Sequence, residues 1–263
     1  MEVEVGGLRI AYERRGSGPP LVLLHGGLGD RRDWEPQLDG LSDELTVVAW
    51  DAPGCGGSDD PPPTFRFPDY ADVLAGFIEA LGLGRPHALG LSWGSTLALE
   101  LYRRRPDMPR TLILAAGYAG WAGSLQPEVV RRRVTDTLAE LDTFAPQEYA
   151  RTWIPTLFTE RAPAELVERS LRVMAEFRPA GVRPMLHAMA EADLREVLPT
   201  IGVPTLLIHG ELDVRSPVTV AREMHASIPR SSLAMLPNVG HMCNLETPDA
   251  FNAVVREFLT RAG

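Results

Sequence analysis

The chain has 263 residues, of which 44% are hydrophobic, and a formal net charge of −9 at pH 7. That is enough for one large α/β domain with an inserted subdomain, and the acidic balance argues against nucleic acid or an anionic membrane as partner. No apolar run approaches the roughly 18 residues of a membrane span, and the first residues carry no signal-like stretch. We therefore expect a soluble, cytoplasmic protein that acts on a small molecule.

The composition also excludes several kinds of chemistry. All 26 basic residues are arginine, which rules out a Schiff-base lysine, a pyridoxal phosphate anchor and a Walker-type phosphate loop. Cys55 and Cys243 are too few for a disulfide framework or a cysteine-based metal site, so we expect two free thiols. We expect no cofactor and no metal, because the six histidines show no metal-site spacing: His25, His87, His187, His209, His225 and His241.

The first half of the chain predicts alternating strands and helices. Residues 3–12 alternate around Gly6-Gly7, which predicts a β-hairpin at the antiparallel edge of a sheet. Continuous apolar runs then predict strands that are buried on both faces. In chain order we expect a strand at 21–24, a glycine-rich loop at 25–30, a helix at 34–41, a strand at 46–50, a second glycine-rich loop at 51–58, a helix at 69–81, and strands at 86–89 and 111–116.

Between the last two of these strands, the segment Gly90-Leu91-Ser92-Trp93-Gly94 matches the pattern G-x-S-x-G. An apolar strand precedes it, and a strong helix-forming run follows it before three arginines and a proline end the helix. A serine at such a sharp strand-to-helix turn is held in a strained backbone conformation. We expect Gly90 and Gly94 to leave room around Ser92 Oγ. This setting favours a nucleophile elbow over a chance match.

The second half of the chain predicts helices first and then a return to the sheet. We expect only helices over 117–194, with breaks near Pro127, Pro146, Pro163 and Pro184. After strands at 204–209 and 232–236, a terminal amphipathic helix is expected from 247. Between those strands we expect a helix capped by Ser216, with Pro217 at its first position. This order predicts a helical cap of residues 117–195, inserted into a core formed by residues 1–116 and 196–263.

The core pattern indicates an α/β fold with a mostly parallel, doubly wound sheet, in which ligands bind where strands open into loops at their C-terminal ends. The cap must pack on this core, and we expect most of its large apolar residues to serve that packing alone: Trp121, Phe144, Trp153, Phe158, Met174, Phe177, Met185 and Met189.

Three loops at such strand ends carry a serine, an acid and a histidine. A serine hydroxyl is a poor nucleophile unless a base takes its proton and an acid orients that base. Ser92, Asp213 and His241 follow predicted parallel strands in the order serine, acid, histidine that elbow-type enzymes show. Glu211 is the neighbouring acid in the same loop, and we expect it to matter less. We expect His25 to be structural.

Five motifs in order over the whole chain resemble those of the α/β-hydrolase family. They are His25-Gly26-Gly27, Asp51 to Ser58, Gly90 to Gly94, Gly210 to Asp213, and Gly240-His241. The resemblance implies that Ser92 is the nucleophile, His241 the general base and then acid, and Asp213 the orienting acid. It also implies an oxyanion hole made by the backbone N–H of Trp93 and that of Gly27, with Leu28 as the alternative to Gly27.

The resemblance further limits the activity. Epoxide hydrolases and haloalkane dehalogenases of this fold carry aspartate at the elbow, whereas hydroxynitrile lyases use a lysine that this chain lacks. The segments Ala192 to Arg195 and His241 to Glu246 look like those of 3-oxoadipate enol-lactonases and related carboxylesterases. The elbow and the His25 loop are similar to those of proline iminopeptidases. We expect an ester or lactone hydrolase; the alternatives are an iminopeptidase, a C–C bond hydrolase and a non-catalytic receptor.

Overall fold

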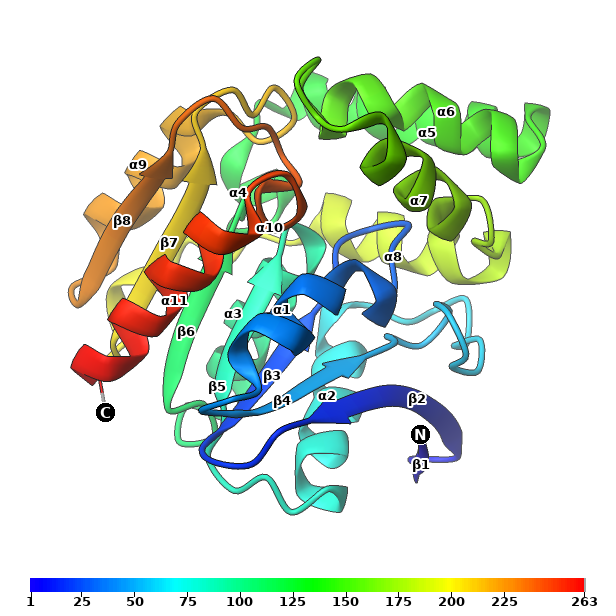
Figure 1. The fold of residues 1–263 in the computed structure, drawn as a ribbon. Helices are drawn as coiled ribbons and strands as arrows, with labels where there is room; N and C mark the ends of the chain where they lie inside the picture. Colours follow the sequence, from blue (N-terminus) through cyan, green and yellow to red (C-terminus); the bar gives the residue numbers. More distant parts are fainter. Residues whose placement is uncertain (263) are drawn as a thin grey trace.

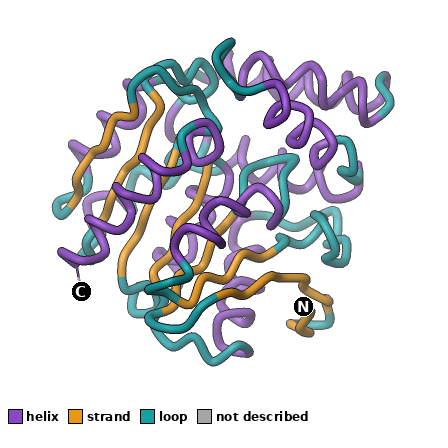
Figure 2. Tube along the Cα trace, in the orientation of Figure 1, coloured by secondary structure: helices purple, strands orange, loops and turns teal. Residues whose placement is uncertain are grey.

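The computed structural model describes residues 1–262, and within them a single eight-stranded sheet forms the centre of the molecule. Its strands appear as orange segments between purple helices in Figure 2. They are β1 (Glu2–Val5), β2 (Leu8–Arg15), β3 (Pro20–Leu24), β4 (Thr46–Trp50), β5 (His87–Leu91), β6 (Thr111–Ala115), β7 (Thr205–Gly210) and β8 (Ser231–Leu236).

The sheet has the order β1-β2-β4-β3-β5-β6-β7-β8. Strands β1 and β2 pair antiparallel and β2 also pairs antiparallel with β4, while every later neighbour is parallel. This confirms the predicted mostly parallel sheet with an antiparallel edge. Because β3, β5, β6 and β7 run in the same direction, the loops that follow them meet at one edge of the sheet.

Helices cover both faces of the sheet (Figure 1). Helices α1 (Glu35–Leu41) and α11 (Pro248–Ala262) pack together on one face, with the short α10 (Cys243–Glu246) between them. Helices α2 (Phe67–Ala80), α3 (Trp93–Arg104) and α9 (Val218–Ser227) lie on the other face. A 3₁₀ turn at Arg31–Trp34 precedes α1, and another occupies Leu198–Thr200. The doubly wound arrangement agrees with the alternating pattern of the sequence.

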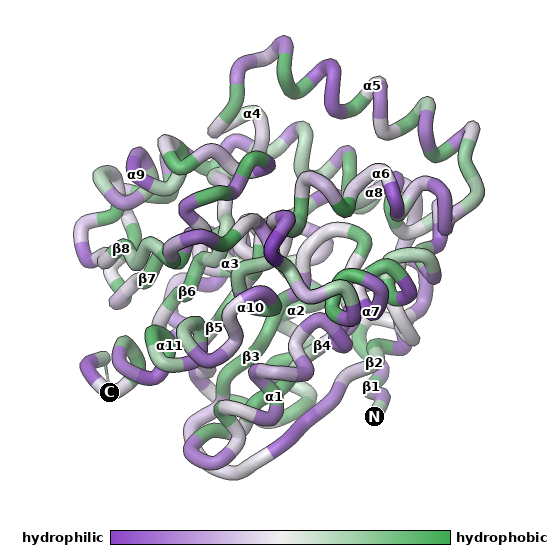
Figure 3. The backbone as a smooth tube through the Cα atoms, turned by 45° about the horizontal axis from the view of Figure 1, so that its top comes forward, coloured by the Kyte–Doolittle hydropathy of each residue, from purple (hydrophilic) through white to green (hydrophobic). Residues whose placement is uncertain are grey.

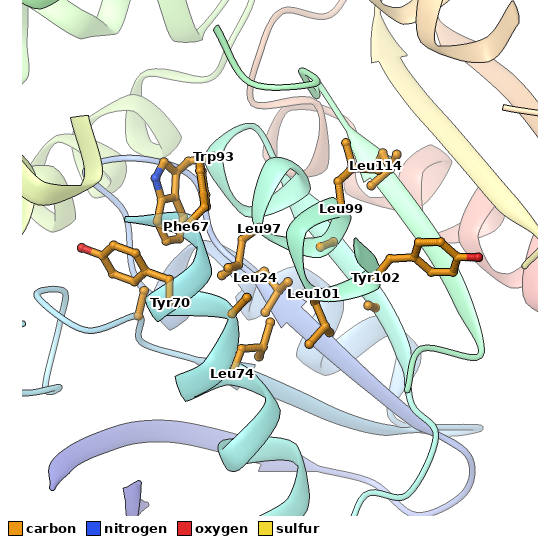
Figure 4. Close-up of a cluster of buried hydrophobic side chains, with 14 of the residues drawn as sticks. Leu24, Phe67, Tyr70, Leu74, Trp93, Leu97, Leu99, Leu101, Tyr102 and Leu114 are labelled. Atoms are coloured by element: carbon orange, nitrogen blue, oxygen red, sulfur yellow. The ribbon is translucent and has the colours of Figure 1, made fainter. Parts of the chain in front are cut away.

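Alternation along the central strands divides the core into two clusters. Leu21 and Leu23 of β3 join the cluster beneath α1 and α11, whereas Val22 and Leu24 join the cluster beneath α2 and α3. All four side chains are at most 1% exposed, as expected for a parallel strand covered on both faces. Hydrophobic colour follows β3, β5 and β6 through the middle of Figure 3. Figure 4 shows part of the second cluster, where α2 and α3 meet.

Five α-helices lie between β6 and β7, and we call them the helical insertion. Figure 1 shows α5, α6 and α7 beyond the edge of the sheet where the strand-end loops meet. Pro127 and Pro146 begin two of these helices and Pro163 precedes a third, as predicted. The insertion comprises α4 (Trp121–Ser124), α5 (Pro127–Thr143), α6 (Pro146–Leu157), α7 (Ala164–Met174) and α8 (Pro179–Glu191). The cap boundaries at 117 and 195 stay a prediction.

Two predicted helix boundaries were wrong. Pro184 lies inside α8 rather than at a break, because its position in the second turn removes only one intrahelical hydrogen bond. Pro217, not Ser216, occupies the N-cap of α9. Ser216 instead donates its hydroxyl to the Gly117 carbonyl oxygen at 3.1 Å, so its side chain holds the loop and cannot cap the helix.

In residues 1–262, no helix is both long and apolar enough to cross a membrane.

Candidate active site

Ser92 sits on a strained turn between β5 and α3. Its φ of 53° and ψ of −112° place it outside the regions that ordinary side-chain-bearing residues occupy. Neighbouring segments hold it there: its N–H donates to the Ala115 carbonyl oxygen at 2.8 Å, and its own carbonyl accepts from Ser95. The predicted strand, turn and helix are therefore confirmed around Ser92. Backbone strain of this kind is typical of functional residues.

The two glycines of the elbow are needed for backbone packing. A Cβ atom on Gly90 would lie 2.2 Å from the Gly94 carbonyl oxygen. One on Gly94 would lie 2.1 Å from the Leu24 carbonyl oxygen and 2.7 Å from that of His25. The nearest atoms thus belong to the first turn of α3 and to the end of β3. The sequence pattern predicts instead that these glycines leave room around Ser92 Oγ. The glycines allow α3 to start directly against the neighbouring strand.

His241 and Asp213 form a buried pair at the same edge of the sheet. His241 Nδ1 lies 2.8 Å from Asp213 Oδ2, although the residues are 28 positions apart. The other carboxylate oxygen of Asp213 accepts the backbone N–H groups of Arg215 and Ser216, each at 2.8 Å. Burial raises the pKa of Asp213, but the charge and hydrogen bond of His241 and the Ser216 N–H hold it below its ordinary value. Asp213 is therefore an ionised carboxylate that fixes the histidine ring.

A second histidine, His209, lies near the same carboxylate oxygen. His209 Nε2 lies 3.6 Å from Asp213 Oδ2 and donates to the Ser216 carbonyl oxygen at 2.8 Å. Burial lowers the pKa of His209 below its ordinary value, so the ring is neutral and acts as a hydrogen-bond donor. Sequence reasoning did not single out His209, although its place at the end of a strand was a signal. Glu211, the other acid of this loop, is exposed.

Ser92 and His241 line one cavity together with both residues predicted for the oxyanion hole, Gly27 and Trp93. Leu28, the alternative to Gly27, also lines it and has a positive φ of 63°. Most of the remaining lining is apolar, and Tyr118, Thr137 and Arg215 add polar groups. The other lining residues are Gly26, Leu91, Trp121, Trp153, Leu157, Val182, Met185, Leu186, Met189 and Met242.

The loop that carries Gly27 is anchored by His25, which is fully buried. His25 Nε2 accepts the Ala52 N–H at 2.9 Å, which leaves the ring proton on Nδ1 to be donated to the Gly26 carbonyl oxygen at 2.8 Å. His25 therefore ties the loop after β3 to the loop after β4. It does not line the cavity, which agrees with the structural role expected from the sequence.

The backbone of Trp93 is fixed by its side chain. The indole ring packs against Phe67 and Tyr70, with ring centroids 5.1 Å and 5.0 Å away (Figure 4). Its Nε1 donates to the Met185 carbonyl oxygen of α8 at 3.2 Å. Because Trp93 is the first residue of α3, its backbone N–H has no acceptor within the helix.

The helical insertion supplies apolar lining and no acid. Of its eight large apolar residues singled out above, Trp121, Trp153, Met185 and Met189 line the cavity, which shows that more of them reach it than the sequence predicted. Among the described residues, no aspartate or glutamate belongs to the lining. The glutamates of the insertion lie away from this lining. Glu140 is half-buried, and five others are exposed: Glu128, Glu148, Glu165, Glu168 and Glu176.

Residues 1–262 contain no group of three or more histidine, cysteine, aspartate or glutamate side chains that could hold a metal ion. Cys55 and Cys243 are buried free thiols, and burial raises the pKa of both. Of the polar groups at the cavity, Ser92, the His241–Asp213 pair and the nearby backbone N–H groups offer nucleophilic, acid–base and anion-stabilising chemistry. A mostly parallel, doubly wound sheet with a serine elbow and an acid–histidine pair at one edge defines the α/β-hydrolase class.

Comparison with known proteins agrees with this class. The model of the Alpha/beta hydrolase family matches residues 21–254, so the chain belongs to that family. Among solved structures, it is similar to a thermophilic esterase from Thermogutta terrifontis, with 30% identity and a TM-score of 0.92 over 100% of this chain and 99% of that one. It is also similar to the enol-lactonase from Burkholderia xenovorans LB400, with 26% identity and a TM-score of 0.89 over 99% and 100% of the two chains.

A peptidase is among the relatives as well. The proline iminopeptidase of Lactobacillus acidophilus is 28% identical over 275 aligned positions, which cover 94% of this chain and 92% of that protein. The family and the hydrolase class are thus clear, whereas the bond that is cleaved differs among the relatives.

Proposed function

We propose that the protein is a serine hydrolase that cleaves a small carboxylic ester or lactone through an acyl-enzyme on Ser92. The observation that carries the proposal is the hydrogen bond between His241 Nδ1 and Asp213 Oδ2, 2.8 Å long, beside a cavity that Ser92 also lines. A bond from Nδ1 to an ionised carboxylate leaves Nε2 free to act as the base toward a serine.

In the proposed reaction, Ser92 Oγ attacks the carbonyl carbon while His241 Nε2 takes the hydroxyl proton. The tetrahedral intermediate collapses as the bond to the leaving oxygen breaks, and His241 returns the proton to that oxygen. Water then repeats the sequence on the acyl-enzyme, releasing the acid and the free serine. Asp213 stays ionised throughout and stabilises the imidazolium.

The negative oxygen of the intermediate needs two backbone donors. We assign one to Trp93, whose N–H at the first position of α3 has no helical acceptor and lies at the positive end of the helix dipole. The other is Gly27 or its neighbour Leu28, which line the cavity on the loop held by His25. Loss of one such donor typically costs about 10²–10³ in kcat.

An ester or lactone suits this cavity better than a peptide with a free N-terminus. A desolvated ammonium group needs carboxylate partners, and no described aspartate or glutamate lines the cavity. An ester needs no such anchor, and its alkoxide leaves more readily than an amine. The esterase and the enol-lactonase with TM-scores of 0.92 and 0.89 support the same choice. Because a proline iminopeptidase is among the relatives, aminopeptidase activity is the second candidate.

The test compares a short-chain phenyl ester and a small lactone with a proline arylamide. We expect kcat/KM for the ester or lactone to exceed that for the arylamide by at least about 10², which is nearly 3 kcal/mol in transition-state binding. If the arylamide is cleaved as fast or faster, the iminopeptidase alternative takes the place of this proposal.

Folded Ser92→Ala and His241→Ala variants are the controls, and each should lower kcat at least about 10³-fold.

A fluorophosphonate probe distinguishes an enzyme from a binding protein of the same fold. Rapid covalent labelling of the wild type, absent in Ser92→Ala, supports the enzyme, whereas an unlabelled folded wild type supports a receptor.

A further inference from the structure

Arg215 lines the same cavity as Ser92 and His241, two positions after Asp213. Its backbone is held on both sides: its N–H donates to Asp213 Oδ1 at 2.8 Å, and its carbonyl oxygen accepts from Arg133 Nη2 at 2.8 Å and from the Tyr118 hydroxyl. The residue is therefore a rigid part of the site, and its side chain starts from a fixed point beside the acid of the proposed triad.

The guanidinium of Arg215 extends toward the helical insertion. Its central carbon lies 3.5 Å from the ring centroid of Trp153, and Nη1 lies 3.3 Å from Thr156 Oγ1. No aspartate or glutamate of residues 1–262 forms an ion pair with this guanidinium. By contrast, Arg183 in α8 of the helical insertion pairs with Asp142. The chain has 35 acidic residues against 26 basic ones, so this absence does not reflect a shortage of carboxylates.

Arg215 is half-buried. A cation that is partly removed from water carries a desolvation cost, which an aromatic face and one hydroxyl offset only in part. Burial lowers the pKa of Arg215 to about 10, so the group remains protonated at neutral pH. A guanidinium offers five N–H donors in a planar fork that matches a carboxylate, and only one of them has a side-chain acceptor here.

We propose that Arg215 binds a carboxylate carried by the substrate, so that the protein acts on esters or lactones with a second, ionised carboxyl group. This inference rests on the proposed ester or lactone hydrolysis and names its substrate class. A monoanionic carboxylate fits better than a phosphate dianion, because Arg215 is the one arginine in the described lining. Arg133 is already engaged with Trp121, Tyr118 and the Arg215 carbonyl.

The experiment uses monophenyl esters of glutaric and adipic acid, each paired with a shape-matched neutral ester in which –CONH₂ replaces the free carboxylate. We expect wild-type kcat/KM for at least one of the anionic esters to exceed that of its neutral partner by about tenfold or more, mainly through KM. In Arg215→Gln this ratio should fall to about one or below. Because each variant is compared with itself, any effect on Asp213 cancels.

The matched control is Arg151→Gln, which removes the same charge from an exposed position of α6 and should keep the wild-type ratio. A ratio near one in a wild type that hydrolyses the neutral esters, or a preference that survives in Arg215→Gln, overturns the role of Arg215 and leaves the esterase proposal standing. If the folded wild type hydrolyses none of these esters, nor phenyl acetate, the proposed function fails and this inference fails with it.

Discussion

Asp213 shows how one side chain can organise a site. One carboxylate oxygen accepts two backbone N–H groups of its own loop, and the other holds the His241 ring at 2.8 Å. The loop thereby fixes the carboxylate, and the carboxylate fixes the histidine tautomer. His209 Nε2 lies 3.6 Å from the same carboxylate oxygen that binds His241. This environment keeps Asp213 ionised without exposing it to water.

The first prediction separates the two acids of this loop. Asp213→Asn should lower kcat by up to about 10⁴, because an amide that donates to His241 Nδ1 forces the wrong tautomer. Glu211→Gln should change kcat by less than about threefold, since Glu211 is exposed and the His241 ring is bonded to Asp213 instead. Steady-state kinetics on one phenyl ester, with circular dichroism to verify folding, measure both effects. The reverse ranking moves the acid role to Glu211.

At the scale of elements, the site depends on how closely α3 approaches β3. The first turn of α3 starts against the Leu24 and His25 carbonyl oxygens, and glycine at position 94 permits that contact. The same junction positions Ser92, the Trp93 N–H and the loop of Gly27. Packing at this junction is therefore part of the site.

We expect Gly94→Ala to lower the free energy of unfolding by about 2–3 kcal/mol, because its Cβ would lie 2.1 Å from backbone that cannot move away cheaply. Urea denaturation measures the loss. The matched control is Gly202→Ala, where the nearest atom is 3.8 Å away and φ is not positive, and it should change stability by less than about 0.5 kcal/mol. Equal stabilities of the two variants would contradict this account of the elbow.

For the molecule as a whole, the helical insertion is fastened to the core beside the cavity. Gly181 of α8 packs so closely on the Gly54 loop that a Cβ would lie 2.1 Å from the Gly54 carbonyl oxygen. Arg178 binds that loop at three points: the Asp60 carboxylate at 2.7 Å and the Gly56 and Ser58 carbonyl oxygens at 2.8 Å and 2.7 Å. The walls of the cavity thus come from both the core and the helical insertion, and these contacts hold the two parts at a fixed separation.

The stability of the whole chain should also depend on Asp33, which is 5% exposed in the turn before α1. Burial, with the nearby charge of Asp30, raises the pKa of Asp33 to about 8. Below about pH 4 the carboxyl is neutral in both states and carries no penalty. Between about pH 4 and 8 it ionises only on unfolding, so the free energy of unfolding falls as pH rises. Above about pH 8 the effect levels off.

Asp33→Asn removes this titration while keeping the shape of the side chain. The stability of the variant relative to wild type should therefore increase from pH 4 to pH 8, by an amount on the order of 2–5 kcal/mol. Urea unfolding at several pH values measures the difference. Asp136→Asn, the same substitution at an exposed position of α5, is the matched control. If the stability difference between Asp33→Asn and wild type is the same at every pH, Asp33 is already ionised in the folded protein over this range.

Local sequence determined much of this protein. Apolar runs bounded by glycine and proline predicted the strands, and their alternation with helices predicted the parallel sheet, because a βαβ unit has few ways to bury its faces. The elbow was readable because only glycine fits where α3 starts against β3, and the strand-end positions of Ser92, Asp213 and His241 followed from the sheet.

The tertiary structure decided the contacts that no motif predicted. The family resemblance implied that Asp213 orients His241, but only the pairing of β7 with β8 explains how the two meet across 28 positions and why His209 lies 3.6 Å from the same carboxylate oxygen. That strand pairing has no signature in any single segment. The same holds for Arg215, whose sequence neighbours do not reveal that it lies over Trp153 from a distant helix. Contacts between residues far apart in sequence depend on how helices and strands pack, and packing is a property of the whole molecule.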